Sequence, residues 1–505
     1  MRNQLRGIEG PIGLVIHSPA VAAWLRVIAG PIGLLLAAQT VVITADSRAP
    51  FSLRVAEPVL ALPPPPPQPA RAPEPELPLI SGDTGKAKVI AQARVLGHNR
   101  PLLQDEVGNV IAGGLPKEFV RANAPPGNAI PIENESALGA FHAALRRLRE
   151  GKLEGGKVRI LSFGASHTQA DLYLGYLRTY FQQLFGNGGP GFVNVSKLDV
   201  WDKKIEVKIN SSGFKVQRIH GLRPAVPGYF GLLGAAAVAS GSSPAHAWLD
   251  LTGSAEERRE PMTVQLHSMG TPDGSEFEVQ VDGVASGRFV TRTPSPIPLF
   301  HRVNAPNGFA RIELRKLGPG TLRIFGAVIE RTTPGVVVDN LGIQGTKLTD
   351  MLEADESVWS AAVRERKPQL VMLAYGTNEY ASGVNLVNYR TDIEQSFERL
   401  KRAAPEASCL VIGPGDLGKA RTPKLKERLA VIIETHREFA LRYGCGFWDA
   451  FAFMGGHGSM LRWVSANPPL AASDKTHLNP RGYVLMGMRL ADALLQSPSP
   501  KTQQL

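Results

Sequence analysis

The strongest constraint on the fold comes from short apolar runs that alternate with amphipathic segments in two separate parts of the chain. In the later part we expect strands at 335–339, 370–374, 409–412 and 446–449, with helices at 348–360, 386–404, 424–443 and 480–495. An earlier part repeats the pattern, with a helix at 137–150, a strand at 158–163 and a helix at 172–185. Alternation of strands and helices of this length predicts an α/β domain with a three-layer architecture and a parallel sheet.

The character of the sequence changes between residues 199 and 330. Short runs with strand character alternate there with turns rich in Gly, Pro, Asn and Asp, at 247–251, 262–268, 277–281, 289–292, 310–314 and 322–329. Close spacing of this kind is typical of an antiparallel sandwich. We therefore expect an all-β module at 199–330, inserted between a first part (133–198) and a second part (331–496) of the α/β domain.

The N-terminal region carries the signals of export. Arg2, Arg6 and Arg26 precede the largely apolar run Val27–Ala45, so residues 1–45 fit a signal peptide or a signal anchor. We interpret residues 46–80 as a Pro-rich linker, 81–132 as an irregular extension and 497–505 as a tail. We expect an exported protein of the periplasm or cell envelope, whose N-terminal segment is either cleaved or serves as a membrane tether.

Composition narrows the choice of partners. The formal net charge is +11, but Lys and Arg are dispersed and no basic run is interleaved with aromatic residues, which argues against nucleic-acid binding. Cys409 and Cys445 are each flanked by apolar residues, so we expect two unpaired buried side chains; a disulfide between neighbouring strands is the alternative in an oxidising compartment. No Cys–His cluster has metal-ligand spacing, and we predict neither a metal nor a cofactor.

Three short motifs carry the residue types of acyl-transfer chemistry. They are Gly164-Ala165-Ser166-His167 after one strand, Gly376-Thr377-Asn378-Glu379 after another, and Asp474-Lys475-Thr476-His477 near the C-terminus. A serine is a weak nucleophile until a base removes its proton, and His477 is the best candidate for the base of Ser166. Asp474 lies three residues before His477 and can fix its tautomer and orientation.

An oxyanion needs converging hydrogen-bond donors. The side-chain amide of Asn378, the backbone N–H of Gly345 and the backbone N–H of Ser166 all follow expected strands and would supply three. Each feature also has a simpler interpretation, because asparagines cap helices and glycines permit turns.

In this order the motifs resemble those of the SGNH (GDSL-like) hydrolase superfamily, whose four named residues correspond to Ser166, Gly345, Asn378 and His477. Asp474 matches the acid that precedes the histidine. The resemblance covers about 133–192 and 336–495. Two further segments, Gly188–Phe192 and Met454–Met460, resemble the bacterial envelope branch that includes peptidoglycan O-acetylesterases.

The resemblance implies a serine esterase that removes O-acyl groups, most simply O-acetyl, from an envelope polysaccharide or peptidoglycan. It also implies a jelly-roll, carbohydrate-binding-like sandwich for the insertion. One position departs from the family pattern, because Ala165 stands where the family usually has an acid that supports the backbone around the serine.

Other residues and functions remain open at this point. His167 and His457 are candidate substrate contacts, and Glu379 is expected to be a structural hydrogen-bonding group. An O-acetyltransferase could use the same site with a sugar hydroxyl as acceptor. A non-catalytic carbohydrate-binding homologue is the other alternative, motivated by Ala165. A lipid esterase is disfavoured because no strongly apolar lid segment is evident.

Overall fold

Residues 130–199, 206–220 and 228–495 are described by the computed structural model, and all of them belong to one unit, Ile80–Leu505. The expected signal segment, the linker, nearly all of the irregular extension and the tail lie outside the described residues, so these four interpretations stay predictions. A search of the described part of the chain finds no helix that is both long and apolar enough to cross a bilayer.

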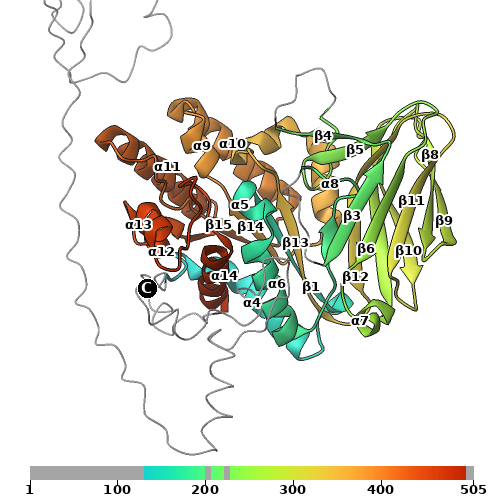
Figure 1. Ribbon diagram of the computed structural model, residues 1–505, viewed down its shortest axis with the longest axis horizontal. Helices are drawn as coiled ribbons and strands as arrows, with labels where there is room; N and C mark the ends of the chain where they lie inside the picture. Colours follow the sequence, from blue (N-terminus) through green and yellow to red (C-terminus); the bar gives the residue numbers. More distant parts are fainter. Residues whose placement is uncertain (1–129, 200–205, 221–227, 496–505) are drawn as a thin grey trace, which may run out of the picture. The chain divides into compact units, whose positions relative to one another are not determined.

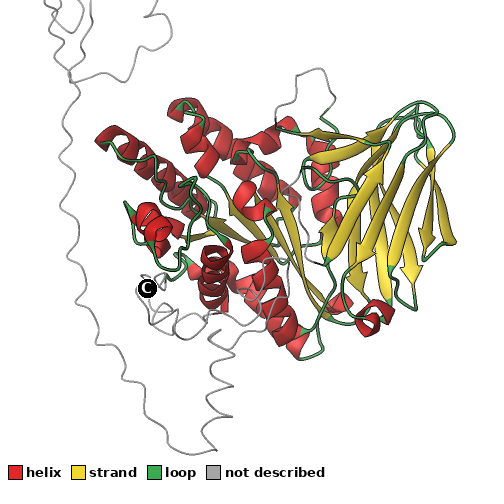
Figure 2. Cartoon of the chain, viewed as in Figure 1, coloured by secondary structure: helices red, strands yellow, loops and turns green. Residues whose placement is uncertain are grey.

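A parallel sheet forms the centre of the α/β domain (Figures 1 and 2). Its strand order is β13 (Gly335–Gly342), β1 (Lys157–Gly164), β14 (Leu370–Ala374), β15 (Ser408–Ile412) and β16 (Gly446–Trp448). All four strand pairs are parallel, and β1 aligns with β13 along its full length, from Lys157 opposite Gly335 to Gly164 opposite Gly342. The predicted parallel sheet is confirmed.

Helices cover both faces of this sheet because its strands are apolar on both sides. One face packs on α4 (Gly139–Arg149), α6 (Leu172–Phe185), α12 (Ala450–Met454), α13 (Ser459–Ser465) and α14 (Pro480–Leu495). The other face packs on α8 (Glu356–Arg366), α10 (Leu386–Ala403) and α11 (Pro423–Arg442). Within β1, Val158 and Ile160 join the first core while Leu161 and Phe163 join the second. The three-layer prediction is therefore confirmed.

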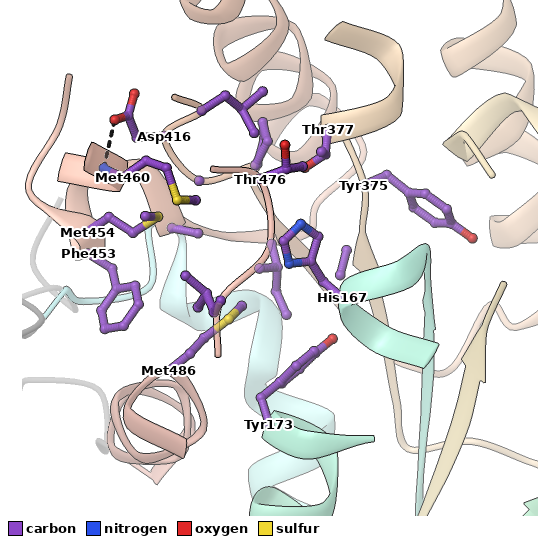
Figure 3. A pocket seen from close by; sticks show the side chains of 18 residues that line it. His167, Tyr173, Tyr375, Thr377, Asp416, Phe453, Met454, Met460, Thr476 and Met486 are labelled. Atoms are coloured by element: carbon purple, nitrogen blue, oxygen red, sulfur yellow. Dashed lines mark hydrogen bonds between the residues drawn. The ribbon is translucent and has the colours of Figure 1, made fainter. Parts of the chain in front are cut away.

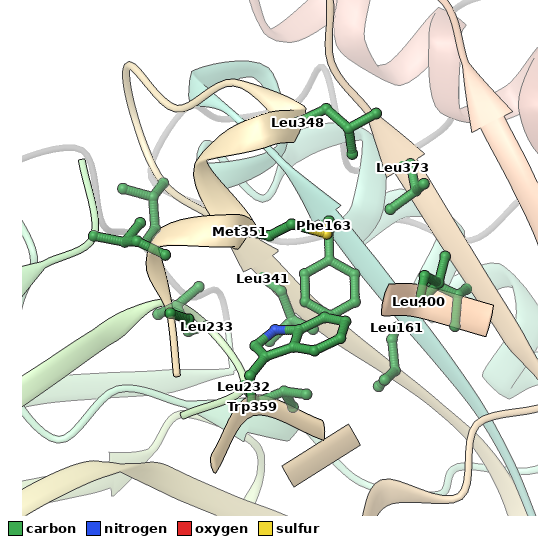
Figure 4. Close-up of a cluster of buried hydrophobic side chains, with 14 of the residues drawn as sticks. Leu161, Phe163, Leu232, Leu233, Leu341, Leu348, Met351, Trp359, Leu373 and Leu400 are labelled. Atoms are coloured by element: carbon green, nitrogen blue, oxygen red, sulfur yellow. The ribbon is translucent and has the colours of Figure 1, made fainter. Parts of the chain in front are cut away.

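The prediction of one continuous helix at 348–360 is wrong. The structure has a 3-10 helix, η3 (Leu348–Glu353), and then α8, which begins at Glu356. Asp355 separates them, because its side chain accepts a hydrogen bond from the N–H of Val358 and so caps the new helix. Trp359 of α8 then packs against Phe163 with ring centroids 5.8 Å apart, inside a cluster that also takes Leu232, Leu233 and Leu341 (Figure 4).

Residues 191–331 contribute two antiparallel sheets (Figure 1). The first has the order β10 (Ile297–Ala305), β7 (Met262–Gly270), β12 (Leu322–Arg331), β5 (Ala235–Ala239), β4 (Lys215–Arg218), with β2 (Gly191–Val193) also paired to β12. The second has the order β3 (Val207–Ser212), β6 (His246–Leu251), β11 (Arg311–Leu317), β8 (Glu276–Val281), β9 (Val284–Val290). Inward residues of both sheets, such as Leu249, Val264, Phe277 and Ile324, share one core.

Most expected strands of this region coincide with observed ones, with two kinds of difference. The strand expected at 289–292 only overlaps the end of β9, which starts at Val284. Strands β3, β4, β5 and β10 were not expected. Outward residues of β3 and β10 are often exposed, and Ala-rich β5 has few of the β-branched residues that mark a strand.

A buried ion-pair network joins the parallel sheet to the antiparallel part. Glu330 on β12 lies 2.8 Å from Arg159 on β1 and 2.8 Å from Arg366 on α8, and Arg366 also lies 2.7 Å from Asp339 on β13. Burial alone raises the pKa of Glu330, but the hydrogen bonds and charges of Arg159 and Arg366 more than offset this and lower it to about 2. The contact between the parallel sheet and the antiparallel part thus contains buried charges that are all paired with opposite charges.

The two cysteines form a disulfide, so the favoured expectation of unpaired side chains is wrong. Cys409 on β15 is bonded to Cys445, which directly precedes β16, and their Cα atoms are 4.6 Å apart. The physical reason is the sheet order: β15 and β16 are neighbours, which places the two residues side by side.

Candidate active site

Ser166 lies at the carboxyl edge of the parallel sheet. Strand β1 ends at Gly164, the buried Ala165 follows, and Ser166 opens the short helix α5 (Ser166–Gln169). A Cβ at position 164 would overlap the Thr168 side chain, so the turn can be this tight only with glycine there. This strand–turn–helix geometry leaves the Ser166 side chain partly exposed.

Ser166, His477 and Asp474 form a continuous chain of hydrogen bonds. The Oγ of Ser166 lies 2.8 Å from Nε2 of His477, and Nδ1 of His477 lies 2.6 Å from Oδ2 of Asp474. Because a carboxylate only accepts, Nδ1–H of His477 donates its hydrogen bond to Asp474, and Nε2 is left as the acceptor for the Ser166 hydroxyl. The structure therefore brings together three residues that lie up to 311 positions apart.

The turn that carries His477 holds Asp474 ionised. Oδ1 of Asp474 accepts hydrogen bonds from the N–H groups of Thr476 and His477, both at 2.9 Å. Partial burial raises the pKa of Asp474, but hydrogen bonds from the backbone and imidazole of His477 and from Thr476 outweigh it, and the net shift is downward. The acid thus stays charged and keeps the imidazole oriented.

The proposed oxyanion donors lie on two neighbouring loops of the same edge. Gly345 follows β13 with a φ of +84°, a conformation that favours glycine. Asn378 sits in α9 (Thr377–Ala381) after β14, and its Nδ2 donates a hydrogen bond of 2.8 Å to the carbonyl of Thr346. A primary amide has two N–H groups, so this bond fixes the side chain and leaves the second N–H for a ligand.

The side chain of Glu379 joins these two loops through hydrogen bonds to the backbone of each. Its carboxylate is fully buried and accepts hydrogen bonds of 2.8 Å from the N–H of Gly376 and 2.8 Å from the N–H of Leu348. Burial raises the pKa of Glu379, and the backbone hydrogen bonds offset part of that rise. The residue has the structural hydrogen-bonding geometry expected from the sequence.

A buried polar cluster supports the Ser166 helix. Asp171 forms a two-point ion pair with Arg178, at 2.8 and 3.2 Å, and accepts a hydrogen bond from Asn340 of β13 at 2.9 Å. Asn340 also donates to the carbonyl of Thr168 in α5. Sequence reasoning missed this cluster, although an Asp followed seven residues later by an Arg on an otherwise apolar helix was a visible signal.

The ring of His167 lies next to that of His477 and lines a cavity. Its ring centroid is 5.0 Å from that of His477, and its Nδ1 lies 2.8 Å from the hydroxyl of Tyr483. Burial, reinforced by the neighbouring His477, lowers the pKa of His167 to about 3. His167 is therefore a neutral group at physiological pH.

The cavity beside His167 has a volume of about 50 Å³ (Figure 3). Figure 3 shows His167 and Tyr173 on one side and the apolar side chains of Phe453, Met454, Met460 and Met486 on the other. The lining also includes Thr377 and Thr476, the residues just before Asn378 and His477. At roughly 10–15 Å³ for each water-sized position, the cavity holds about four non-hydrogen atoms.

His457, the other candidate contact, is exposed in the loop before α13. Its ring packs edge-on against Phe451, with centroids 4.8 Å apart, and its Nδ1 lies 3.9 Å from Asp416, a residue of the cavity lining. No interaction among the described residues joins His457 to Ser166 or His477.

The described residues do not meet the requirements of a metal site. Among those residues no group of three or more His, Cys, Asp or Glu side chains is arranged to hold a metal ion.

Comparisons with known proteins agree with this architecture. The model of the GDSL-like Lipase/Acylhydrolase family matches residues 313–485, a range that contains Gly345, Asn378, Asp474 and His477. A solved structure described as "Peptidoglycan O-acetylesterase in action, 5 min" is similar with a TM-score of 0.58 and 22% identity, covering 72% of this chain and 96% of that one. No curated protein matches significantly.

A more remote similarity is to a family two carbohydrate esterase from Clostridium thermocellum in complex with cellohexaose, with a TM-score of 0.25, 13% identity and coverage of 52% of this chain and 96% of that one. The match at 313–485 begins on β11 and does not include the Ser166 motif, but the fold brings Ser166 within 2.8 Å of His477. Residues 313–485 thus match the GDSL-like Lipase/Acylhydrolase family, and the fold is similar to that of an esterase.

Proposed function

We propose that this protein is an exported serine esterase that removes O-acetyl groups from an envelope polysaccharide or peptidoglycan. The observation that carries the proposal is the hydrogen-bonded chain from Ser166 through His477 to Asp474, at the sheet edge where Asn378 presents its amide. These are the parts that activate a hydroxyl nucleophile and hold a developing oxyanion.

The reaction proceeds through an acyl-enzyme. Ser166 Oγ attacks the ester carbonyl carbon while Nε2 of His477 takes the hydroxyl proton, and Asp474 stabilises the imidazolium that forms. The carbonyl oxygen gains negative charge and accepts hydrogen bonds from the N–H groups of Ser166 and Gly345 and from the Asn378 amide. The tetrahedral intermediate collapses, the C–O bond to the sugar breaks, and His477 returns the proton to the departing sugar oxygen.

Water completes the cycle. It attacks the acetyl-Ser166 ester, with His477 again as the base, and releases acetate and the free hydroxyl. We assign the small cavity beside His167 to the acyl group, and its volume of about 50 Å³ favours an acetyl over a fatty chain.

The polymer and the compartment are inferred from different features. We assign the two antiparallel sheets with their shared core to a β-sandwich of carbohydrate-binding type that positions the polymer, supplying binding energy remote from the reacting ester. The similarity to a peptidoglycan O-acetylesterase supports peptidoglycan as one such polymer. The Cys409–Cys445 disulfide supports an oxidising compartment, as the apolar run near the N-terminus does.

Acetate release from acetylated envelope polymers, measured for the wild type and for Ser166→Ala, tests the proposal. We expect release by the wild type and a loss of at least about 10³-fold in the variant. Ser268→Ala is a matched control, because Ser268 lies 2.8 Å from Nε2 of His301 but is buried between the antiparallel sheets and should be dispensable for turnover.

Two readouts separate the alternatives. A series of 4-nitrophenyl esters should show the highest kcat/KM for acetate and a decline beyond butyrate. Newly acetylated sugar in place of free acetate would assign the site to transfer, and a folded wild type without turnover on any polymer or ester would overturn the proposal.

A further inference from the structure

One histidine from the antiparallel part, His220, lies next to Gly345, whose N–H is a proposed oxyanion donor. His220 follows β4, and its ring edge packs on Gly345: a Cβ built on Gly345 would lie 3.0 Å from Cδ2 and 3.1 Å from Nε2 of His220. The Nε2 edge of the imidazole is therefore adjacent to the glycine whose N–H faces the ester carbonyl in the proposed mechanism.

The position of His220 is fixed by its neighbours. Ile219, the preceding residue, is buried in the same hydrophobic cluster as Ile343, and its N–H donates a hydrogen bond of 2.8 Å to the carbonyl of Gly234. Gly234 in turn packs between these two isoleucines, since a Cβ on it would touch both. His220 is thus anchored on the oxyanion loop by packing that belongs to the core.

Asp350 fixes the orientation and the tautomer of the ring. Oδ2 of Asp350 lies 3.1 Å from Nδ1 of His220 and also accepts the N–H of Lys347 at 3.0 Å, while Oδ1 pairs with Nζ of Lys347 at 3.2 Å. Because the carboxylate only accepts, Nδ1 carries the proton and Nε2 keeps its lone pair. Lys347 balances the charge of Asp350, and the lone pair of Nε2 is the acceptor that this cluster presents.

The His220 side chain is 43% exposed, and its Nε2 has no hydrogen-bond partner among the described residues. A hydroxyl donor complements an imidazole lone pair, and a glycan carries hydroxyls on its sugar rings. We propose that His220 is a substrate-binding residue, which accepts a hydrogen bond from a sugar hydroxyl close to the scissile ester and so lets the antiparallel part select a glycan ester over a simple one. This inference rests on the proposed function.

Kinetics on two substrates test it. 4-Nitrophenyl acetate has no sugar hydroxyl, whereas an O-acetylated oligosaccharide from an envelope polymer has several. In His220→Ala we expect KM for the oligosaccharide to rise about 3- to 10-fold, the effect of one neutral hydrogen bond, with kcat within about twofold and 4-nitrophenyl acetate nearly unchanged. His220→Gln, which keeps an acceptor, should recover part of the KM.

His142→Ala is the control variant, because its partly buried ring bonds the carbonyl of Leu494, outside the site, and should alter neither substrate. An equal loss on both substrates in His220→Ala would show that the ring only supports Gly345 and would overturn the proposal. Unchanged oligosaccharide kinetics would overturn it as well, while leaving the esterase assignment intact. Absence of turnover by the wild type would instead refute the esterase assignment itself.

Discussion

Replacing Glu379 by alanine should damage both the stability and the turnover of this protein. The Glu379 carboxylate is the shared acceptor for the N–H of Gly376, just before Asn378, and the N–H of Leu348, just after the Gly345 loop. Alanine leaves both donors buried without this partner. The hydrogen bond from Asn378 to Thr346 would still join the two loops, but their shared buried acceptor would be gone.

The size of the effect follows from the two lost bonds. A buried donor left unsatisfied costs about 1–3 kcal/mol, so we expect a loss of roughly 2–6 kcal/mol in the free energy of unfolding. A misplacement of about 1 Å in a group that stabilises the transition state lowers the rate by about 10²-fold, so kcat on 4-nitrophenyl acetate should fall by that order.

Glu257→Ala gives a matched control for Glu379→Ala. Glu257 makes the same local contact, because its carboxylate accepts the N–H of Ser254 at the start of α7 (Ala255–Arg259), but it does so on the surface of the antiparallel part. We expect that variant to lose about 1 kcal/mol at most and to keep its kcat. Urea unfolding followed by circular dichroism, with steady-state kinetics, measures both. If Glu379→Ala is no less stable than Glu257→Ala and keeps its kcat within about threefold, the reasoning is wrong.

Three further predictions concern the charges and the backbone of the site and its junction. The pKa of Glu330 falls from 4.5 to about 2 on folding, so its ionised form stabilises the native state above about pH 4.5 and this contribution is lost as the pH falls toward 2. At about 1.4 kcal/mol per pKa unit this amounts to roughly 3 kcal/mol, and acid unfolding of Glu330→Gln should lack that part of the pH dependence. Asp474→Asn should lower kcat by about 10³- to 10⁴-fold without a comparable loss of stability, because the Asp474 side chain is half exposed and acts through His477; normal unfolding together with near-normal kcat would contradict this. Gly345→Ala should cost about 1–2 kcal/mol and reduce turnover, because φ is +84° and His220 occupies the space, whereas Gly383→Ala, with φ of +67° and nothing within 4 Å, should show the backbone cost alone with full activity.

The sequence predicted the α/β layers well because period and length there carry the information. β14 and α14 coincide with their expected ranges, since Leu370–Ala374 is apolar on both faces and Pro480 marks the first helical residue. The interruption between η3 and α8 escaped prediction because the apolar spacing continues through it and only the capping of Asp355 reveals it. The antiparallel strands were partly missed because half-exposed edge strands such as β9 have little periodic apolar signal.

Sequence order also limited what could be expected of the site. Ser166, Asn378 and His477 follow recognisable motifs, so their common location follows from the rule that parallel strands end at one edge. His220 follows no motif and comes from the antiparallel part. Its contact with Gly345 depends on the packing of Ile219 in the same cluster as Ile343 and on the hydrogen bond to Asp350. A contact set by packing between two parts of a chain leaves no local trace in either of them.

Ala165 illustrates how a lost residue is replaced by a different arrangement. The resemblance assigns an acid at this position to the support of the backbone around the serine, and here the position is a buried alanine. Asp171 lies at the other end of α5, with a φ of 54°, and its carboxylate holds Arg178 and Asn340. Asn340 bonds the carbonyl of Thr168 and the N–H of Gly342, so the acid supports the serine helix and the start of the Gly345 loop together. Since this support runs through β13 instead of the turn itself, the absence of an acid at 165 does not leave Ser166 unsupported, and it gives no reason to regard the protein as a degenerate binding homologue.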